Sequence, residues 1–579
     1  MPVTDSLRVQ GATPGTDSVA IDFQGRAIRG RRGETVAAAL TAAGERELRE
    51  TKSGERRGLF CGMGVCQECL VEIDGRGNQR ACMTKLDRPC SVRRQSHLAS
   101  TVDLPPPTHQ PVEDGDVLTP NVLVLGGGAG GLNAAAIAAR AGARVLLVDE
   151  RPQSGGQYYK QPLHPAGHSA LPDDAQFAGG RALIAEAEAA GVVFLRGAQL
   201  WGAFEPLELM IFDGQASRLC RPQRLIVAAG AYERGVPFPG WTLPGVMTTG
   251  AAQTLLRSYA VLAGRRVLVA GNGPLNLQVA LELARAGAEI AAVIELAGRP
   301  GVSAAAALLK MLTSTPGLAM RGRAYLAEVK RRGIPLLHRH VIASVERAGD
   351  RLRAQVTPWP AADGDASTRS YEVDTVCVGY GFMPSNEILR ALGCRHAFDA
   401  ERGHLVTERD GDGLTSVAHV YAVGDCTGLG GAPAAEVEGI IAGLAAARSL
   451  GLAPAAGQEQ AVARARRQLR RHRRFQSGLW ELFRAPRLLT ELASPETMIC
   501  RCEEVTLAEI ESGFDPGTQS VGAVKRATRA GMGRCQGRYC GPVLAALAAS
   551  RRGLSLDEAA HWAPRPPVKP IRIADIVGS

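Results

Sequence analysis

The sequence lacks long apolar runs, and this absence argues against a membrane-spanning protein. Its longest apolar stretches, at residues 121–125 and 144–148, have the length of strands, whereas a membrane-spanning helix needs about 20 apolar residues. The first ten residues, MPVTDSLRVQ, contain no basic start followed by an apolar run, so we expect no signal peptide. We therefore expect a cytoplasmic protein without a transmembrane segment.

A redox-active cysteine pair is missing from the middle of the chain. No C-x2-C occurs between residues 83 and 499, and the cysteines of that region lie far apart in the sequence. We interpret these cysteines as structural, which argues against thiol–disulfide exchange; they are Cys220, Cys377, Cys394 and Cys426. In a reducing compartment, closely spaced cysteines are more often metal ligands than disulfide partners.

Aromatic residues are scarce, at 4%, while basic residues are in excess and give a net charge of +10. Much of that excess lies at residues 464–474, RARRQLRRHRR. This run has no interleaved aromatic residues of the kind on which single-stranded nucleic acids stack. A nucleic-acid patch is one interpretation. We favour a solvated helical face or a surface that meets an acidic partner, and expect no nucleic acid.

Eight of the thirteen cysteines form two spaced quartets, one toward each end of the chain. The first quartet is Cys61, Cys66, Cys69 and Cys82, with the spacing C-x4-C-x2-C-x12-C. This spacing is typical of plant-type [2Fe–2S] ferredoxins, and Gly62 and Gly64 allow the backbone to bend round a cluster. A zinc site or free thiols are the alternatives. Because zinc ribbons prefer paired C-x2-C knuckles, we predict a [2Fe–2S] cluster.

The residues around the first quartet predict a small unit of strand, helix and cysteine loop. Residues 19–28 alternate like one strand, residues 34–43 are helix formers, and residues 69–73 suit another strand. This order predicts a β-grasp, ferredoxin-like fold.

The second quartet is Cys500, Cys502, Cys535 and Cys540, with the spacing C-x-C-x32-C-x4-C. It resembles the BFD-like (bacterioferritin-associated ferredoxin-like) [2Fe–2S] domain, although that pattern usually closes with C-x2-C. Nearby arginines would offset the negative charge of a cluster; they are Arg501, Arg529, Arg534 and Arg538. Zinc is again the alternative.

A glycine-rich loop follows a strand pattern at residues 121–150, NVLVLGGGAGGLNAAAIAARAGARVLLVDE. Gly126 permits the tight turn, Gly128 lets the backbone approach a pyrophosphate, and Gly131 lets helix and strand pack closely. The start of the helix offers free N–H groups to the phosphates. Asp149, 23 residues past Gly126, is the candidate for the ribose hydroxyls, with Glu150 as its neighbour.

Two further segments favour FAD over NAD at this loop. Residues 225–230, LIVAAG, end at Gly230 and resemble the apolar strand and turn of disulfide-reductase-like flavoproteins. Residues 419–425, HVYAVGD, resemble their final FAD strand, and this resemblance implies that Asp425, after Gly424, meets the ribityl chain. A helix at residues 434–444 would direct its N-terminus at the flavin. In the segment GGQYYKQ, Gly156 and Gln157 complete the predicted cofactor-binding set.

A second strand–loop–helix unit occurs at residues 266–295 and looks like an internal duplication. It keeps Gly271 and Gly273, but Asn276 replaces the third glycine, which we expect to weaken the packing of helix against strand. Glu295 is placed to hold a ribose. An NAD site remains open beside a relic of the fold or a surface reused for another cofactor or subunit.

These patterns predict a multi-domain α/β protein, because 579 residues are too many for one core. The expected fold is a β-grasp ferredoxin-like domain, a flavoprotein core with two dinucleotide-binding domains of disulfide-reductase type, and a small helical BFD-like domain. The expected units are a ferredoxin-like domain (1–102), a Pro-rich linker (103–120), an FAD-binding domain in two parts (121–245 and 366–454), an NAD-like domain (246–365), a basic helical connector (455–495), and the BFD-like domain with a tail that runs over another surface (496–579).

Several phrases together resemble one known family. They are GGQYYKQ, PFPGWTLPGVMTTGAAQTLL, CVGYGFMPSNE, CRCEEVT and GMGRCQGRYCGP. They resemble the large (A or α) subunits of opine oxidases, hydrogen cyanide synthase and D-hydroxyproline dehydrogenase, and part of the large subunit of heterotetrameric sarcosine oxidase. The resemblance covers nearly all of residues 17–575, with a ferredoxin-like unit, separate in some relatives, fused at the N-terminus.

The resemblance implies a complex in which a separate β subunit of D-amino-acid-oxidase type oxidises a secondary amine or amino acid at its own FAD. It also implies that FMN can lie between subunits, and that the first nucleotide site holds NAD or ATP in some relatives. The expected acceptor is a quinone or a carrier protein, so peripheral contact with the inner membrane through that acceptor stays open.

We therefore predict an electron-transfer subunit that passes electrons from the β-subunit flavin to two [2Fe–2S] clusters. The alternatives are a self-sufficient NADH-dependent flavin and iron–sulfur reductase, and a non-catalytic docking subunit that carries clusters. No acid–base constellation for amine chemistry stands out, so the catalytic residues stay unknown. We interpret the candidate histidines as structural; they are His164, His168, His338 and His340.

Overall fold

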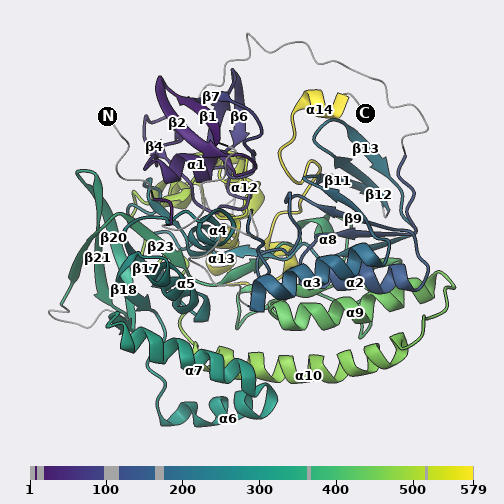
Figure 1. The fold of residues 1–579 in the computed structure, drawn as a ribbon. Helices are drawn as coiled ribbons and strands as arrows, with labels where there is room; N and C mark the ends of the chain where they lie inside the picture. Colours follow the sequence, from purple (N-terminus) through teal and green to yellow (C-terminus); the bar gives the residue numbers. More distant parts are fainter. Residues whose placement is uncertain are drawn as a thin grey trace.

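The computed structural model describes residues 7–9, 18–96, 117–163, 175–205, 207–360, 367–514 and 520–577. Figure 1 shows a small N-terminal sheet domain above two larger α/β units, with the C-terminal segments between and behind them. His164, His168 and most of the predicted linker lie outside the described residues. Among the helices in these ranges, none has both the length and the apolar character needed to cross a membrane.

The N-terminal domain is a mixed five-stranded sheet that holds one buried helix. Its elements are β1 (Ser18–Phe23), β2 (Arg26–Arg31), α1 (Val36–Ala42), β3 (Arg49–Glu50), β4 (Arg56–Arg57), β5 (Leu70–Ile73), β6 (Arg76–Arg80) and β7 (Cys90–Arg94). The strand order is β2-β1-β7-β5-β6, with β1 and β7 parallel. Thr35 caps α1 by accepting the N–H of Ala38, and every residue of α1 is buried. The predicted ferredoxin-like fold is confirmed.

One strand of the N-terminal domain differs from its prediction. Residues 19–28 form a hairpin of β1 and β2 rather than a single strand. Gln24 and Gly25 have positive φ angles of 54° and 83°, and such residues make the tight turn between antiparallel strands. The alternation of apolar residues continues across this turn, which is why the pattern suggested one strand.

The first nucleotide-binding unit is a parallel sheet with the strand order β10-β9-β8-β14-β27. Its elements are β8 (Val122–Leu125), α2 (Ala129–Arg140), β9 (Val145–Asp149), α3 (Ala175–Ala189), β10 (Val193–Arg196), β14 (Arg224–Val227), β27 (Val420–Ala422) and α9 (Ala432–Ser449). Helices α2 and α9 pack closely because α9 has glycines at the contact: a Cβ at Gly439 would lie 2.1 Å from the carbonyl oxygen of Gly130.

The second unit repeats this arrangement with the order β16-β23-β17-β18-β19. Its elements are β16 (Val246–Thr248), α4 (Thr249–Tyr259), β17 (Arg266–Gly271), α5 (Pro274–Arg285), β18 (Glu289–Glu295), α6 (Ala305–Ser314), α7 (Pro316–Arg331), β19 (Leu336–His338) and β23 (Thr375–Gly379). The two strand–loop–helix units that the sequence indicated therefore both fold as predicted, β8-α2-β9 and β17-α5-β18.

Smaller antiparallel sheets and short helices connect these units. They are β11 (Gln199–Glu205), β12 (Glu208–Phe212) and β13 (Ser217–Cys220); β15 (Ala231–Glu233) with β24 (Phe382–Pro384); β20 (His340–Ala348), β21 (Arg351–Pro358) and β22 (Arg369–Val373); α8 (Glu387–Ala391); and β25 (His396–Asp399) with β26 (His404–Thr407).

The basic connector is one long helix, α10 (Gln458–Leu482), which lies along α9 and α6 (Figure 1). Part of its positive charge meets acids of the core, since Arg473 pairs with Glu438 at 3.3 Å and Arg466 pairs with Asp412. The apolar residues Val462, Ala465 and Leu469 are buried against α9 and α2. The run at residues 464–474 is thus the outer face of an amphipathic helix.

The C-terminal domain is small and helical, and its tail returns to the first nucleotide-binding unit. Its elements are β28 (Met498–Cys500), β29 (Val505–Thr506), α11 (Leu507–Ser512), α12 (Val521–Thr528), α13 (Gly541–Arg551) and α14 (Ile573–Val577). In the tail, Val568 donates its N–H to the carbonyl of Trp201 at 2.8 Å, and Lys569 pairs with Glu150. The tail therefore runs over another surface, as predicted; α14 lies beside β13 and β11 in Figure 1.

Candidate redox site

The first quartet lies on a buried loop between β4 and β5. The Sγ atom of Cys61 accepts the backbone N–H groups of Met63 and Cys66, each at 3.4 Å. Gly62 and Gly64 have φ angles of 63° and 76°, a left-handed backbone that turns N–H groups toward sulfur. A Cβ at Gly62 would lie 3.0 Å from the Cα of Ala251, so the loop also packs directly on α4.

The sulfur atoms of this loop form pairs that influence each other's ionisation. Burial works to raise the pKa of Cys61, but hydrogen bonds from Cys66 and from the loop N–H groups lower it to about 6. Burial and its hydrogen bond to Cys61 raise the pKa of Cys66. Cys69 and Cys82 form the other pair. The thiolate is the form that binds metal, so a loop that stabilises a thiolate suits a metal centre.

The second quartet also comes together, although its closing spacing is C-x4-C. The Sγ atoms of Cys502 and Cys535 are 3.7 Å apart, those of Cys500 and Cys502 are 4.0 Å apart, and Cys500 also contacts Cys540. Gly531 donates its N–H to Cys500 Sγ at 3.5 Å. Gln536 and Gly537, with φ angles of 57° and 76°, take up the two extra residues in a turn before α13.

The sulfur pairs give a test of fit for iron–sulfur centres. Two thiolates on one tetrahedral metal ion at about 2.3 Å lie roughly 3.8 Å apart, close to the separation of Cys502 and Cys535. A [2Fe–2S] cluster takes two such pairs, and each quartet supplies two. Over the described residues, no three His, Cys, Asp or Glu side chains are arranged to hold a single metal ion.

Aromatic rings connect the two quartets. The Phe60 ring lies edge-to-face against Tyr539, with centroids 5.4 Å apart, and against Trp241, with centroids 5.8 Å apart. Phe60 precedes Cys61 in the sequence, and Tyr539 precedes Cys540. All three rings belong to one hydrophobic cluster, which also contains Cys61, Cys66 and Cys535. The quartets at the two ends of the chain are therefore neighbours in space.

A buried group of charges lies beside these rings. Glu68 is completely buried, and its carboxylate accepts hydrogen bonds from Arg49 Nη2 at 3.2 Å. The Nε atoms of Arg57 and Arg501 are each 3.8 Å from the same carboxylate. Burial opposes ionisation of Glu68, but Arg49, Arg501 and Arg57 hold its pKa below the ordinary value. Arg501 places its guanidinium 3.8 Å from the Phe60 centroid and 4.5 Å from that of Trp241.

Three buried arginines surround this one buried carboxylate. Several of their nitrogens make no hydrogen bond; these are Nε of Arg49, Nε and Nη2 of Arg57, and Nε of Arg501. Buried positive charge without enough partners is costly, and a negatively charged cluster beside each cysteine loop would offset it. The residues present therefore fit two iron–sulfur centres. Of this group, the sequence had drawn attention only to Arg501. Glu68, between Cys66 and Cys69, carried a signal by its position alone.

The first nucleotide loop has the close contacts that its glycines predicted. A Cβ at Gly131 would lie 1.8 Å from the carbonyl oxygen of Gly126, and one at Gly126 would lie 2.4 Å from that of Ala228. Gly128 caps the start of α2 and faces Gly156, whose own Cβ would lie 2.8 Å from the Cα of Gly128. The start of α2 is thus open to a pyrophosphate.

The two candidate ribose acids have different surroundings. Asp149 accepts the N–H of Gly127 at 3.1 Å and that of Arg151 at 2.9 Å, and burial raises the pKa of its carboxyl to about 6. Glu150 instead pairs with Lys569 of the tail. Asp149 therefore faces the loop, whereas Glu150 is engaged by the C-terminal segment.

The other predicted flavin residues gather at the carboxyl ends of β8, β14 and β27, where parallel sheets bind ligands. Gly230 follows β14 with a φ angle of 72°. Asp425 follows β27 and accepts the N–H groups of Gly430 and Gly431 at 2.9 and 2.7 Å, just before α9. Gly424 donates its N–H to Glu438 at 2.9 Å. The helix predicted at residues 434–444 is part of α9.

A pocket joins this nucleotide unit to the first quartet. It is lined by Gly62 and Cys82 from the cysteine loop and by Gly156 and Lys160 from the segment after β9, beside Tyr259 of α4. Lys160 is buried and donates to Gln253 Oε1 at 2.9 Å, and burial lowers its pKa to about 7. Gln157 lies in the same segment, and its carbonyl accepts from Lys160. Sequence reasoning did not single out Lys160, although it lies inside the motif GGQYYKQ.

The second nucleotide loop is built alike but is more enclosed. Glu295 accepts the N–H of Gly273 at 3.0 Å, and burial raises its pKa to about 7. Asn276, expected to weaken the packing, instead donates to the carbonyl of Gly379 at 2.9 Å and accepts from the Thr249 hydroxyl at 2.9 Å. Asn272 donates to the carbonyl of Phe483, which brings the end of α10 onto the loop.

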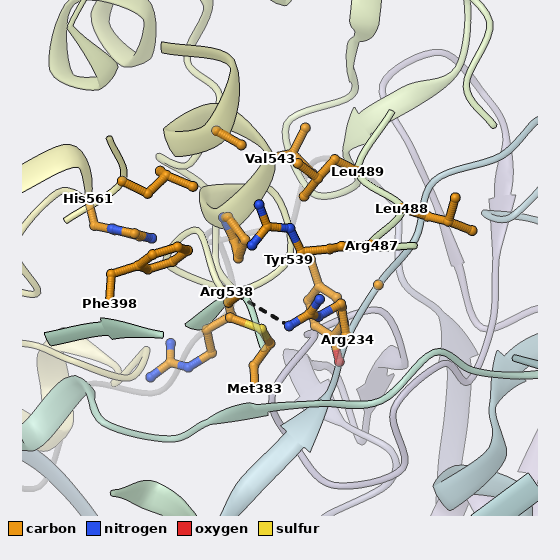
Figure 2. Close-up of a pocket in the computed structure, with 15 residues that line it drawn as sticks. Arg234, Met383, Phe398, Arg487, Leu488, Leu489, Arg538, Tyr539, Val543 and His561 are labelled. Carbon is orange, nitrogen blue, oxygen red and sulfur yellow. Dashed lines mark hydrogen bonds between the residues drawn. The ribbon is translucent and has the colours of Figure 1, made fainter. Parts of the chain in front are cut away.

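A second pocket lies beside the C-terminal quartet, at the surface of α13 that faces away from the first quartet. Figure 2 shows Arg234, Arg487 and Arg538 gathered there with Tyr539 and His561. Arg234 donates to the carbonyls of Arg402 and Gly403, and burial, with a smaller effect of Arg487, lowers its pKa to about 10. No residue that lines this pocket is acidic.

The remaining candidates do not join these sites. His338 and His340 lie with their Nδ1 atoms at backbone carbonyls, at 3.3 and 2.7 Å, near the strands β19 and β20. The four scattered cysteines are buried in hydrophobic clusters apart from both quartets; they are Cys220, Cys377, Cys394 and Cys426.

Three family models match the chain. A 2Fe-2S iron-sulfur cluster binding domain matches residues 16–97, a pyridine nucleotide-disulphide oxidoreductase matches residues 120–459, and a BFD-like [2Fe-2S] binding domain matches residues 498–550. The second of these covers more than half of the chain. Together the matches indicate flavin and iron–sulfur cofactors.

Curated relatives match over most of their own length. The HcnB subunit of hydrogen cyanide synthase from Pseudomonas aeruginosa is 34% identical over 78% of this chain and 96% of its own. The large (A) subunit of opine oxidase from Rhizobium meliloti is 33% identical over 79% of this chain and 98% of its own. The alpha subunit of sarcosine oxidase from a Corynebacterium species (strain P-1) is 25% identical over 97% of this chain but only 56% of its own.

The crystal structure of L-proline dehydrogenase from P. horikoshii has a similar fold, with a TM-score of 0.69 at 19% identity over 99% of both chains. The fold, the family models and the relatives thus agree. The chain belongs to the pyridine nucleotide-disulphide oxidoreductase family and, within it, to the large subunits of opine oxidase and hydrogen cyanide synthase type, with a [2Fe–2S] domain at each end.

Proposed function

We propose that this chain is the electron-transfer subunit of a multi-subunit FAD-dependent amine or amino-acid dehydrogenase. The donor would be of the opine, sarcosine, hydroxyproline or glycine type, oxidised at the FAD of a D-amino-acid-oxidase-like β subunit. The observation that supports this most is the shared core of the nucleotide pocket and the two quartets: Gly156 and Cys82 line one pocket, and Phe60 contacts Tyr539.

The electron count explains the need for both kinds of cofactor. Oxidation of an amine to an imine converts a C–H and an N–H bond into a C=N bond and releases two electrons and two protons. A [2Fe–2S] cluster accepts one electron at a time, whereas a flavin handles both, so a flavin between donor and clusters splits the pair. A quinone or a carrier protein would then take the electrons.

We assign FAD to the first nucleotide loop, with Asp149 at the ribose and Asp425 toward the flavin. ATP or NAD is the alternative occupant, and FMN at an interface with the β subunit is a further proposal. FAD has more support at this loop because the pocket beyond Gly156 reaches Cys82 of the first quartet. A redox-active ring there lies beside its electron acceptor, whereas ATP would gain nothing from that position.

The test is an anaerobic titration of the chain purified together with its D-amino-acid-oxidase-like partner. Opines, sarcosine, hydroxyproline and glycine are added in turn, while visible absorption follows the flavin and EPR follows the clusters. Bleaching of flavin followed by reduced-cluster signals supports the proposal and identifies the donor class. Bleaching by NADH without the partner would favour the self-sufficient reductase. A bound nucleotide that keeps its redox state under dithionite would favour a docking subunit.

A further inference from the structure

Five residues, here called the junction, connect the ligand loops of the two quartets: Phe60, Glu68, Trp241, Arg501 and Tyr539. We propose that the two iron–sulfur centres are a directly coupled pair in series, the N-terminal one next to the nucleotide site, and that Arg501 and Glu68 set the reduction potential of both. This inference rests on the proposed function for the identity of the centres, and its test needs neither substrate nor β subunit.

Four junction residues lie within one or two positions of a cysteine ligand. Phe60 adjoins Cys61, Glu68 adjoins Cys69, and Tyr539 adjoins Cys540. Arg501 stands between Cys500 and Cys502. A contact between two of these side chains is therefore a contact between two ligand loops. The contacts are the Phe60–Tyr539 ring pair, the Glu68–Arg501 ion pair and the Arg501–Phe60 stack.

The junction is a dry, rigid connection rather than a surface contact. Phe60 is 1% exposed, Glu68 0% and Arg501 5%. Arg501 is further fixed by donating Nη1–H to the carbonyl of Trp241 at 2.8 Å, and Trp241 donates Nε1–H to the carbonyl of Met498 at 2.7 Å. Fixed groups in a medium of low dielectric constant interact strongly with nearby charge.

The order of the two centres follows from what lines the nucleotide pocket. Cys82 and Gly62 of the first quartet's loop line it, and none of the four cysteines of the second quartet does. An electron from a cofactor there reaches the N-terminal centre first. The next step transfers one electron from the reduced N-terminal centre to the oxidised C-terminal centre. It makes and breaks no bond, and the junction supplies no proton.

The charge of the junction explains how one residue acts on both centres. Each centre gains one negative charge when reduced, so a fixed positive charge nearby favours reduction and raises the potential. Arg501 belongs to the C-terminal loop but lies against Glu68 and Phe60 of the N-terminal loop. Removing its charge should lower both potentials, and removing the charge of Glu68 should raise both.

The first experiment is EPR spectroscopy of the dithionite-reduced full chain. We expect the two reduced centres to show a mutual magnetic interaction, seen as split or broadened lines and faster spin relaxation. Cys69→Ser and Cys535→Ser, which each remove a ligand of one centre, should leave a simple unsplit signal from the other. If the native spectrum equals the sum of the two single-centre spectra, coupling in series is wrong. Uncoupled centres that substrate still reduces would overturn this inference but not the proposed function.

The second experiment measures both midpoint potentials in Arg501→Met, Arg501→Lys and Glu68→Gln. We expect Arg501→Met to shift both potentials down, Arg501→Lys to restore most of the shift, and Glu68→Gln to shift both up. Arg529→Met is the matched control: Arg529 is in the same domain but 62% exposed and paired with Glu503. It should give a smaller shift, confined to the C-terminal centre.

Opposite signs from two variants at one ion pair are not a symptom of general misfolding. The double variant Arg501→Met/Glu68→Gln should return both potentials toward the native values, because the two charges couple. The absorption of both clusters confirms that each variant is assembled. A shift of only one centre in Arg501→Met, or equal shifts in Arg501→Met and Arg529→Met, would overturn the role of Arg501.

Discussion

The two nucleotide-binding units have the same chain path, and they solve one packing problem in opposite ways. In the first, the third loop position is Gly131 and the facing residue after β14 is Ala228. In the second, the same position is Asn276 and the facing residue is Gly379. A Cβ at Gly379 would lie 2.4 Å from Asn276 Oδ1, so the side chain has moved from the strand to the helix. The missing third glycine is therefore a compensated exchange and not a gap.

This comparison also separates the two loops by access. The first opens onto the pocket that reaches Cys82, whereas Asn272 of the second bonds to the carbonyl of Phe483 at the end of α10. We expect the first loop to depend on its glycines for both fold and cofactor, and the second mainly to maintain structure. The predictions below test that division.

The largest effect is expected from Gly131→Ala in the first loop. Its Cβ would meet the carbonyl of Gly126 at 1.8 Å, and backbone atoms on both sides cannot yield cheaply. We expect a loss of about 3 kcal/mol in the free energy of unfolding and protein with little bound flavin. Flavin content and urea denaturation measure this. Asn276→Gly, at the matching position, should keep its flavin; equal flavin loss in both variants would remove the distinction.

The next effect compares the two ribose acids. Asp149→Asn should weaken dinucleotide binding by roughly 10- to 100-fold, the value of about 1.5–3 kcal/mol for a hydrogen bond to a charged group. Glu295→Gln should leave flavin content unchanged. Flavin retained per chain after dialysis is the measurement. Retention in Asp149→Asn with loss in Glu295→Gln would mean that the cofactor occupies the second loop.

How far the sequence predicted these features depends on the range of the contacts involved. The glycine loops, the acids and the cysteine spacings are local patterns, and the fold matches them. The β1–β2 hairpin was missed because Gln24 and Gly25 interrupt no alternation. The junction was not predicted, since Phe60 and Tyr539 come from opposite ends of the chain and nothing in either segment indicates its partner. Asn276 was misjudged because its compensating residue, Gly379, is equally remote.

Stability against pH offers a third comparison in protein free of nucleotide. The native pKa values of Asp149 and Glu295 are raised by burial to about 6 and about 7. Each carboxyl thus binds its proton more tightly folded than unfolded, so stability falls as pH rises from about 4 toward 6 for Asp149, and toward 7 for Glu295. The loss should approach about 2–3 kcal/mol each.

Denaturation midpoints between pH 4 and 8 test this. Asp149→Asn should remove the decline below pH 6, and Glu295→Gln the part that extends to pH 7. Saturating FAD should flatten the Asp149 part alone, because ribose hydroxyls would donate to its carboxylate. A profile unaffected by either substitution would show that the two acids do not govern it.

A smaller effect is expected from Asn276→Ala. The change leaves the carbonyl of Gly379 and the hydroxyl of Thr249 without these partners in a buried place, which costs about 1–3 kcal/mol. The double variant Asn276→Gly/Gly379→Ala would copy the first unit, and it should recover part of the loss if the exchange argument holds. Urea denaturation measures both, and a double variant less stable than Asn276→Gly alone would contradict it.

The smallest effect is expected from Glu150→Gln, which distinguishes the two neighbouring acids of the first loop. Glu150 pairs with Lys569, whose side chain is 30% exposed, and such a pair contributes at most about 1 kcal/mol. Because Asp149 faces the loop N–H groups and Glu150 faces the tail, Glu150→Gln should loosen the tail without changing flavin affinity. Limited proteolysis after residue 565 should quicken in both Glu150→Gln and Lys569→Met. Flavin loss in Glu150→Gln but not in Lys569→Met would instead assign Glu150 to the cofactor.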